Sequence, residues 1–241
     1  MNRIALIAAL SIGLAGPAFA QVRCMEGLPP IDRQADARMT PMDLVKDVTA
    51  KELEFNKAFM NFGYTLEIQL QTLNGDTVDG EYHEVTRVEF DSNGARHVNM
   101  VGTPTNTLQR LPLPHRDVDQ MRDAFIITRE VLAGQDVVYS GRQRVQDYNA
   151  AVFDILPRNG QPGSGAFTGR AWVRQREAAI IRSCGRFGGG PFGAMRYLVD
   201  RTRVADLYWF PALVRADEKV RVRDDDVRLR VSVKYSDYKA R

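Results

Sequence analysis

The sequence has few of the side chains that bind metals or act as nucleophiles. Its 241 residues include only three histidines, His83, His97 and His115, and two cysteines, Cys24 and Cys184. Metal sites usually draw on closely spaced histidine or cysteine pairs, and these five residues are widely scattered. No histidine has an obvious nucleophilic partner. We therefore expect no metal site, no cofactor and no enzymatic activity.

An excess of charge of one sign is missing as well. Lysine and arginine number 33 against 30 aspartates and glutamates, so the net charge is +3. A nucleic-acid-binding domain would concentrate its positive charge in one patch, so nucleic acid is not an expected partner. With 44% hydrophobic and 26% charged residues, the composition is that of a globular protein.

Long apolar runs are absent except at the start of the chain. Arg3 is followed by an apolar run over residues 4–15, and Ala18-Phe19-Ala20 fits the small-x-small rule for signal peptidase. The run is shorter than the roughly 20 residues that span a bilayer. We therefore predict a cleavable signal peptide over residues 1–20, cleaved after Ala20, and a periplasmic protein that does not span the membrane.

If the protein is exported as predicted, its two cysteines can form a disulfide, because an oxidising compartment permits such bonds. A bond between Cys24 and Cys184 would tie the N-terminal arm, residues 21–39, to the body of the protein. The arm shows no hydrophobic period and is expected to be extended. One buried and one free thiol is the alternative, and the sequence leaves both open.

One amphipathic helix is predicted after the arm. Thr40 is a suitable N-cap, Pro41 fits the first turn, and Asp43 stands at the capping-box position. Apolar residues then recur at helical spacing until the chain reaches Gly63. The apolar members are Leu44, Val48, Phe55, Phe59 and Phe62. Such a helix needs an apolar surface to cover.

The rest of the chain is mainly β in pattern. Residues 64–71 alternate between apolar and polar, as in a half-buried strand, and Asn74-Gly75 follows as a turn signal. Further strands are expected at 79–90, 97–101, 136–145, 149–156, 167–174, 178–183, 196–203, 207–217 and 227–235, with short helices between 117 and 133.

Connections between these strands are too short for the crossover helices of a parallel sheet. About ten strands in meander order therefore predict one antiparallel sheet, and a sheet of this size curls rather than staying flat. The fold class is mainly β (α+β): residues 40–241 form an incomplete β-barrel, with the helix over its concave side.

Apolar residues on these strands are candidates for the inner wall. If the helix fills the interior, they form an ordinary core, whereas beneath a movable lid they would line a cavity suited to acyl chains. The lid residues would be Leu44, Val48, Phe55 and Phe59. The wall residues are Leu66, Ile68, Leu70, Val88, Phe90, Val98, Met100, Tyr139, Phe153, Ile155 and Val173.

A basic stripe near the C-terminus also permits two interpretations. Arg221, Arg223, Arg228 and Arg230 could meet lipid phosphates, or could form the solvated face of a strand neutralised by neighbouring aspartates. The second interpretation needs fewer assumptions.

Several motifs resemble a group of exported bacterial proteins. Phe167 to Val173, Ala205 to Pro211 and Tyr235 to Lys239 are similar, in this order, to motifs of the LolA/LolB-like outer-membrane lipoprotein carriers and sorting proteins. The resemblance covers roughly residues 43–239. It implies an incomplete antiparallel β-barrel with helices over its open side and a hydrophobic interior that ferries lipid or acylated lipoprotein cargo without covalent chemistry.

Two functions follow as expectations. The first is a periplasmic carrier or binding protein that takes acyl chains into the concave face of the sheet. The alternative is a periplasmic sensor that docks a membrane-anchored regulatory protein through the same fold. Bound lipid after purification would favour the first, and a stable protein partner would favour the second.

Overall fold

The computed structural model describes residues 24–34, 40–113, 118, 127–132, 134–158, 166–187, 190–193 and 195–241. The predicted signal peptide, His115 and most of the segment in which short helices were expected lie outside the described residues.

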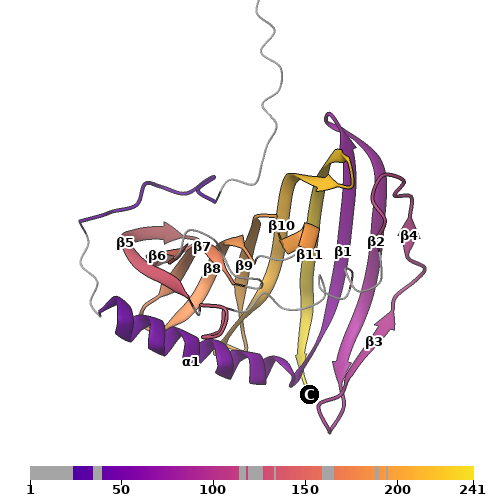
Figure 1. The fold of residues 1–241 in the computed structure, drawn as a ribbon. Helices are drawn as coiled ribbons and strands as arrows, with labels where there is room; N and C mark the ends of the chain where they lie inside the picture. The colour runs from indigo at the N-terminus through magenta and orange to yellow at the C-terminus, as the bar shows by residue number, and fades with distance from the viewer. Residues whose placement is uncertain are drawn as a thin grey trace, which may run out of the picture.

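The described chain forms a long helix followed by a large antiparallel sheet (Figure 1). The strands recur close to the positions that the alternating pattern predicts. The elements are α1 (Pro41–Phe59), β1 (Phe62–Asn74), β2 (Thr77–Phe90), β3 (Arg96–Met100), β4 (Thr105–Asn106), β5 (Gln135–Val145), β6 (Tyr148–Pro157), β7 (Thr168–Arg174), β8 (Ala179–Arg186), α3 (Gly190–Gly193), β9 (Tyr197–Val204), β10 (Tyr208–Val222) and β11 (Asp225–Ala240).

The sheet order shows how the two ends of the chain meet. It runs β3-β2-β1-β11-β10-β9-β8-β7-β6-β5, with the short β4 paired to β2. The sequence predicted one meander of consecutive strands. The structure instead has two meanders, and the pairing of β1 with β11 joins them. The free edges are therefore strands from the middle of the sequence, and the sheet curves without closing into a barrel (Figure 1).

Helix α1 begins where its sequence predicts but ends earlier, and Phe62, which was expected on the helix, is the first residue of β1. Thr40 is the N-cap, and its side chain accepts a hydrogen bond from the backbone N–H of Asp43 at 3.1 Å. The helix ends at Phe59, and β1 begins at Phe62, so a very short connection ties the C-terminal end of α1 to the sheet. Figure 1 shows α1 lying along one side of the curved sheet, where it contacts β5, β8 and β10.

Strand register places the predicted wall residues on one face. Cross-strand partners share a face of the sheet, and one row of partners runs from β6 to β1: Phe153, Ala171, Ser183, Val199, Val214, Val233 and Ile68. We call the face that carries this row the inner face. Alternation along each strand puts the other predicted wall residues on it too.

The prediction that Val98 and Met100 line an enclosed interior is wrong. They are 40% and 46% exposed, although their partners Val88 and Thr86 are buried on the inner face. The reason is position in the sheet, because β3 is a free edge and α1 contacts strands on the far side of β1. Alternation shows which face a side chain takes, but not whether another element covers that face.

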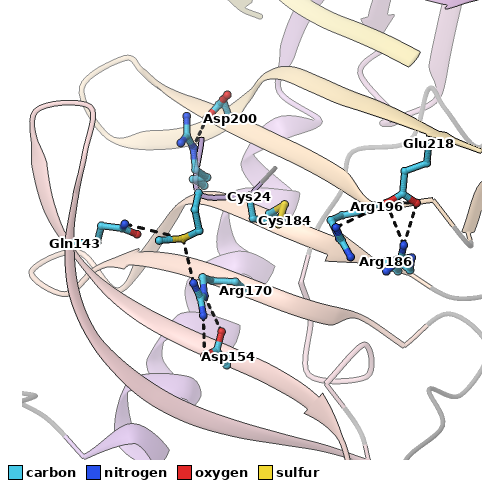
Figure 2. The surroundings of a disulfide bond; sticks show 11 residues. Cys24, Gln143, Asp154, Arg170, Cys184, Arg186, Arg196, Asp200 and Glu218 are labelled. Carbon is cyan, nitrogen blue, oxygen red and sulfur yellow. Dashed lines mark hydrogen bonds and ion pairs between the residues drawn. A yellow bond between two sulfur atoms is a disulfide. The ribbon is translucent and has the colours of Figure 1, made fainter. Parts of the chain in front are cut away.

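The N-terminal arm packs on the opposite face. Cys24 is joined to Cys184 of β8 by a disulfide, and Cys184 alternates with the inward-facing Ser183 (Figure 2). Met25 accepts a hydrogen bond from Arg170 through its sulfur atom at 3.1 Å. Gln143 donates to the carbonyl of Pro29 and accepts from the buried indole of Trp172. The arm therefore covers part of the sheet that α1 does not reach.

Asp154 of β6 supports Arg170 beneath the arm. Two hydrogen bonds join the guanidinium to the carboxylate, at 2.6 and 3.0 Å (Figure 2). Burial alone would raise the pKa of Asp154, but the hydrogen bonds from Arg170 and Ser140 outweigh it and lower the pKa below its usual value. The carboxylate is thus held ionised.

Gly141 allows the arm to approach the edge strand β5. Backbone hydrogen bonds pair Asp32 with Arg142, and Gly141 has a φ of +124°. A Cβ at this position would collide with the backbone oxygen of Asp32. We expect Gly141→Ala to lower the free energy of unfolding by about 2 kcal/mol or more, through backbone strain and this collision.

Gly94→Ala is the matched control, measured in the same urea titration. Gly94 also has a positive φ, +81°, but its added Cβ would meet nothing within 4 Å. We expect it to lose about 1 kcal/mol, the cost of the left-handed conformation alone. Equal losses at Gly94 and Gly141 would show that the arm does not press against β5.

Candidate functional site

The interface between α1 and the inner face is the candidate site, and its first part is apolar. Val48 packs over a set of buried side chains that we call the apolar floor. Ile127, which lies outside the strands, joins the same cluster. The apolar floor consists of Phe153, Ile155, Ala171, Val173 and Ile180.

The C-terminal half of α1 packs against aromatic side chains of the sheet, which we call the rings. Phe59 packs edge-on against Phe210 at 5.1 Å between ring centroids, and it also contacts Tyr64 and Tyr238. Phe55 packs against Tyr208 at 5.9 Å. Burial raises the pKa of Tyr238, whose hydroxyl donates to the carbonyl of Pro211, so this ring stays neutral. These rings anchor the end of α1 that is joined to β1.

A buried ion pair lies between the apolar floor and the rings. Glu52 of α1 accepts two hydrogen bonds from the guanidinium of Arg201 on β9, at 2.5 and 2.7 Å. Their side chains are 1% and 3% exposed. The same carboxylate accepts a hydrogen bond from the backbone N–H of Ile127 at 3.3 Å. One residue of the helix and one of the sheet thus neutralise each other in an apolar interior.

Sequence reasoning missed both members of this pair, although each leaves a signal. Glu52 stands on the apolar stripe of the helix, four residues after Val48 and three before Phe55. Arg201 alternates with the buried Val199, so it falls on the inward side of its strand. A charged residue at an apolar position on two elements is the sign of a buried pair, since buried charges are almost always paired.

The cavities that the described residues form directly beneath α1 are small. A cavity of about 20 Å³ lies over the apolar floor and is lined by apolar side chains that include Val45, Val48 and Leu132. A second cavity, of about 10 Å³, lies beside Glu52 and Arg201. These volumes hold about one water molecule each and no acyl chain. In this closed arrangement Phe153, Ile155 and Val173 therefore pack as core residues beneath α1.

The predicted wall and lid residues differ in where they lie and how deeply they are buried. Phe153, Ile155 and Val173 line the cavity over the apolar floor. Leu66, Ile68, Leu70 and Val88 are buried in the same cluster as Phe59 and Phe210, and Phe90 and Tyr139 are half-buried. Of the lid residues, Val48, Phe55 and Phe59 are buried, and the side chain of Leu44 is not described.

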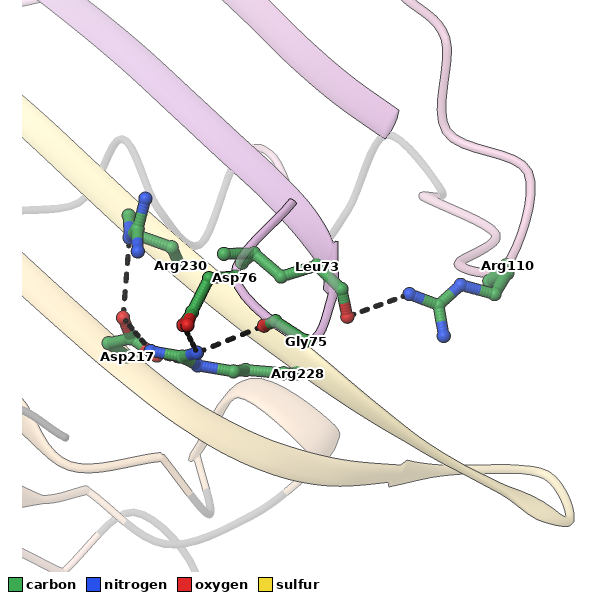
Figure 3. A network of polar contacts seen from close by, with 7 residues as sticks. All are labelled: Leu73, Gly75, Asp76, Arg110, Asp217, Arg228 and Arg230. Atoms are coloured by element: carbon green, nitrogen blue, oxygen red, sulfur yellow. Dashed lines mark hydrogen bonds and ion pairs between the residues drawn. The ribbon is translucent and has the colours of Figure 1, made fainter. Parts of the chain in front are cut away.

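Three of the four arginines in the basic stripe near the C-terminus pair with aspartates. Arg228 is 7% exposed and bonds Asp217 and Asp76, while Arg230 shares Asp217 (Figure 3). Arg221 pairs with Asp226. Figure 3 also shows Arg228 reaching the carbonyl of Gly75, so this arginine ties the β1–β2 turn to the C-terminal strands. Arg228 therefore stabilises the fold and is not available as a phosphate-binding residue.

Two further properties concern the described part of the chain. It contains no group of three or more histidine, cysteine, aspartate or glutamate side chains placed to hold a metal ion. None of its helices combines the length and apolar character needed to cross a membrane.

The fold and site define a class: an open antiparallel sheet, curved around a helix that covers its inner face. No protein-family model and no curated protein matches the sequence. Solved structures do match, and three of them align over 84% of this chain and 94% of the other. A DUF1329 family protein from Desulfovibrio piger has a TM-score of 0.43 at 10% identity, and a LolA superfamily protein from Nitrosomonas europaea has 0.35 at 10%. An outer membrane lipoprotein-sorting protein domain from Vibrio parahaemolyticus has 0.40 at 9%.

One of these three, the Nitrosomonas europaea protein, is described as a member of the superfamily that the sequence motifs resemble.

Proposed function

We propose that this protein is a periplasmic, non-enzymatic carrier that takes the acyl chain of a lipid or lipoprotein between α1 and the inner face of the sheet. The observation that supports the proposal best is the construction of the α1 interface. A continuous apolar floor lies under one helix, and that helix is tied to the sheet at its C-terminal end.

Binding requires α1 to move, because the closed cavities are too small for a chain. The N-terminal half of α1 is the part that would lift, since the rings and the short connection to β1 hold the other half. An acyl chain would then replace Val48 over the apolar floor. Each buried methylene contributes about 0.8 kcal/mol, so a long chain can offset the lost helix contacts.

Periplasmic location rests on the predicted signal peptide and agrees with the Cys24–Cys184 disulfide. Transfer of cargo to a membrane-protein partner is part of the proposal.

Native mass spectrometry of the protein purified from the periplasm tests the proposal. We expect co-purifying lipid that is released on denaturation and identified in the organic extract. Ala171→Leu should reduce bound lipid several-fold, because its side chain would occupy the apolar floor, where Ala171 is 3% exposed. Circular dichroism would establish that the variant is folded.

Val138→Leu is the matched control, because Val138 is 48% exposed and pairs with Asp154 on the opposite face. It should carry as much lipid as the unchanged protein. Protein that is empty, and that takes up no lipid from vesicles, would contradict the carrier function. Recovery of a stable protein partner in place of lipid would support the sensor instead.

A further inference from the structure

We propose that the solvent side of α1 docks on an anionic lipid surface, with three apolar side chains inserted between the head groups and two lysines close to the lipid phosphates. The apolar side chains are those of Met42, Leu53 and Met60, which we call the outer row. The inference goes beyond the proposed carrier function, because the outer row is exposed to solvent whereas the apolar floor lies beneath the buried Val48.

The helical repeat aligns the outer row. Leu53 follows Met42 by 11 residues and Met60 follows it by 18. At about 3.6 residues per turn, these three positions point within about 20° of one another. Met60 is the C-cap residue, and its backbone is still helical, with φ −68° and ψ −8°. With a rise of about 1.5 Å per residue, the outer row extends for about 27 Å along α1.

The members of the outer row are unusually accessible for apolar side chains. Met42 is 82% exposed, Leu53 50% and Met60 41%, and Met42 is the most exposed large hydrophobic residue in the described part of the chain. Single exposed apolar residues are common on protein surfaces, but three in line on one helix form a surface that can contact an apolar partner. Helix α1 therefore has one apolar side against the sheet and a second that faces solvent.

Two lysines accompany the outer row. Lys46 follows Met42 by four residues and Lys57 follows Leu53 by four, so each lysine lies one turn further along the same side of the helix. Both are exposed, and neither forms an ion pair with another residue that the structure describes. Their aliphatic stems can lie along the apolar side chains while the ammonium groups reach the phosphates.

The exposed acidic residues of α1 lie on another side of the helix. Asp47 and Glu54 border a hollow between α1 and the turns of the sheet, which no member of the outer row lines. Glu54 pairs there with Lys51 at 2.7 Å, and Asp43 accepts a hydrogen bond from the N-cap hydroxyl of Thr40. The outer row is thus flanked by positive charge, and this combination matches an anionic lipid surface better than a second apolar protein surface.

Sedimentation with lipid vesicles tests the inference on the protein purified from the periplasm. The probes are vesicles of phosphatidylcholine alone and vesicles that also contain roughly 30% phosphatidylglycerol, which gives a negative surface potential. We expect binding to the anionic vesicles to be about tenfold or more tighter, because each lysine near such a surface contributes about fivefold. High salt should release the protein, since it screens the attraction.

Two variants remove the apolar and the charged contributions separately. Met42→Gln/Leu53→Gln/Met60→Gln should weaken binding to anionic vesicles about tenfold or more, because the inserted side chains no longer leave water. Lys46→Gln/Lys57→Gln should abolish the preference for anionic vesicles. All five side chains are exposed, so both variants should fold, which circular dichroism would establish.

Matched controls carry the same substitutions at exposed positions elsewhere. Leu156→Gln changes an apolar residue of β6 that is 51% exposed. Lys234→Gln/Lys239→Gln removes two exposed lysines of β11, with the same change in net charge as Lys46→Gln/Lys57→Gln. Both controls should bind anionic vesicles as the unchanged protein does.

Three results would overturn the inference. The first is equal binding, or no binding, of the unchanged protein to the two kinds of vesicle. The second is unchanged binding of the outer-row variant or of the Lys46/Lys57 variant. The third is a dimer in size-exclusion chromatography that the outer-row variant disrupts, which would make the outer row a contact between copies. None of these results decides the carrier function, which depends on lipid retained by the soluble protein.

Discussion

Glu52→Gln is expected to lower the free energy of unfolding by about 3–5 kcal/mol, the usual cost of breaking a buried ion pair by removing one partner. Arg201 keeps its charge, is 3% exposed and would lose the ionised carboxylate of Glu52. Arg201→Met should cost a similar amount, since it leaves Glu52 buried. Urea unfolding followed by circular dichroism at neutral pH measures both losses.

The double variant Glu52→Met/Arg201→Met decides whether the losses come from the pair. Removing both charges leaves an apolar interface, so we expect stability within about 1 kcal/mol of the unchanged protein or above it. The losses of the single variants would then be strongly non-additive, as for two residues in direct contact. Additive losses would mean that the two side chains do not interact.

An exposed pair provides the comparison. Arg158 and Asp136 are joined at 2.9 Å, but their side chains are 62% and 53% exposed. Solvent screens such a pair, and Asp136→Asn should change stability by less than about 1 kcal/mol. A loss as large as that of Glu52→Gln would show that burial is not what makes the Glu52–Arg201 pair important.

Removing the disulfide is expected to have an effect of comparable size. Cys24 and Cys184 are separated by 160 positions, so their bond closes a very long loop in the unfolded chain. Restricting that chain stabilises the folded state, and the double variant Cys24→Ser/Cys184→Ser should lose about 2–5 kcal/mol in urea unfolding. Met25, Leu28 and Ile31, which pack against the core, would be held more weakly.

The unchanged protein under a reducing agent is the control, because it loses the bond without any substitution. It should unfold at the same urea concentration as the double variant, apart from a small effect of the serines. The double variant itself should not respond to the reducing agent. Identical midpoints for the oxidised protein and the double variant would show that the arm contributes no stability through this bond.

Sequence patterns came close to the strands because alternation with a period of two is a local property. Residues 64–71 and 227–235 were recognised from their own order of apolar and polar side chains, and they lie within β1 and β11. The direct pairing of these two strands was not deduced, because the apolar–polar pattern within a segment does not indicate which other strand it pairs with. Capping signals similarly located the start of α1 at Thr40.

What the sequence determined by itself is the set of elements and the face that each apolar side chain takes, because both depend on neighbours within a few positions. The tertiary structure decided how full the interior is, which inward residues stay exposed, and that Glu52 meets Arg201 across 149 positions. Those outcomes depend on side chains brought together from distant segments. Alternation along a single strand therefore cannot distinguish the apolar floor from the exposed Val98.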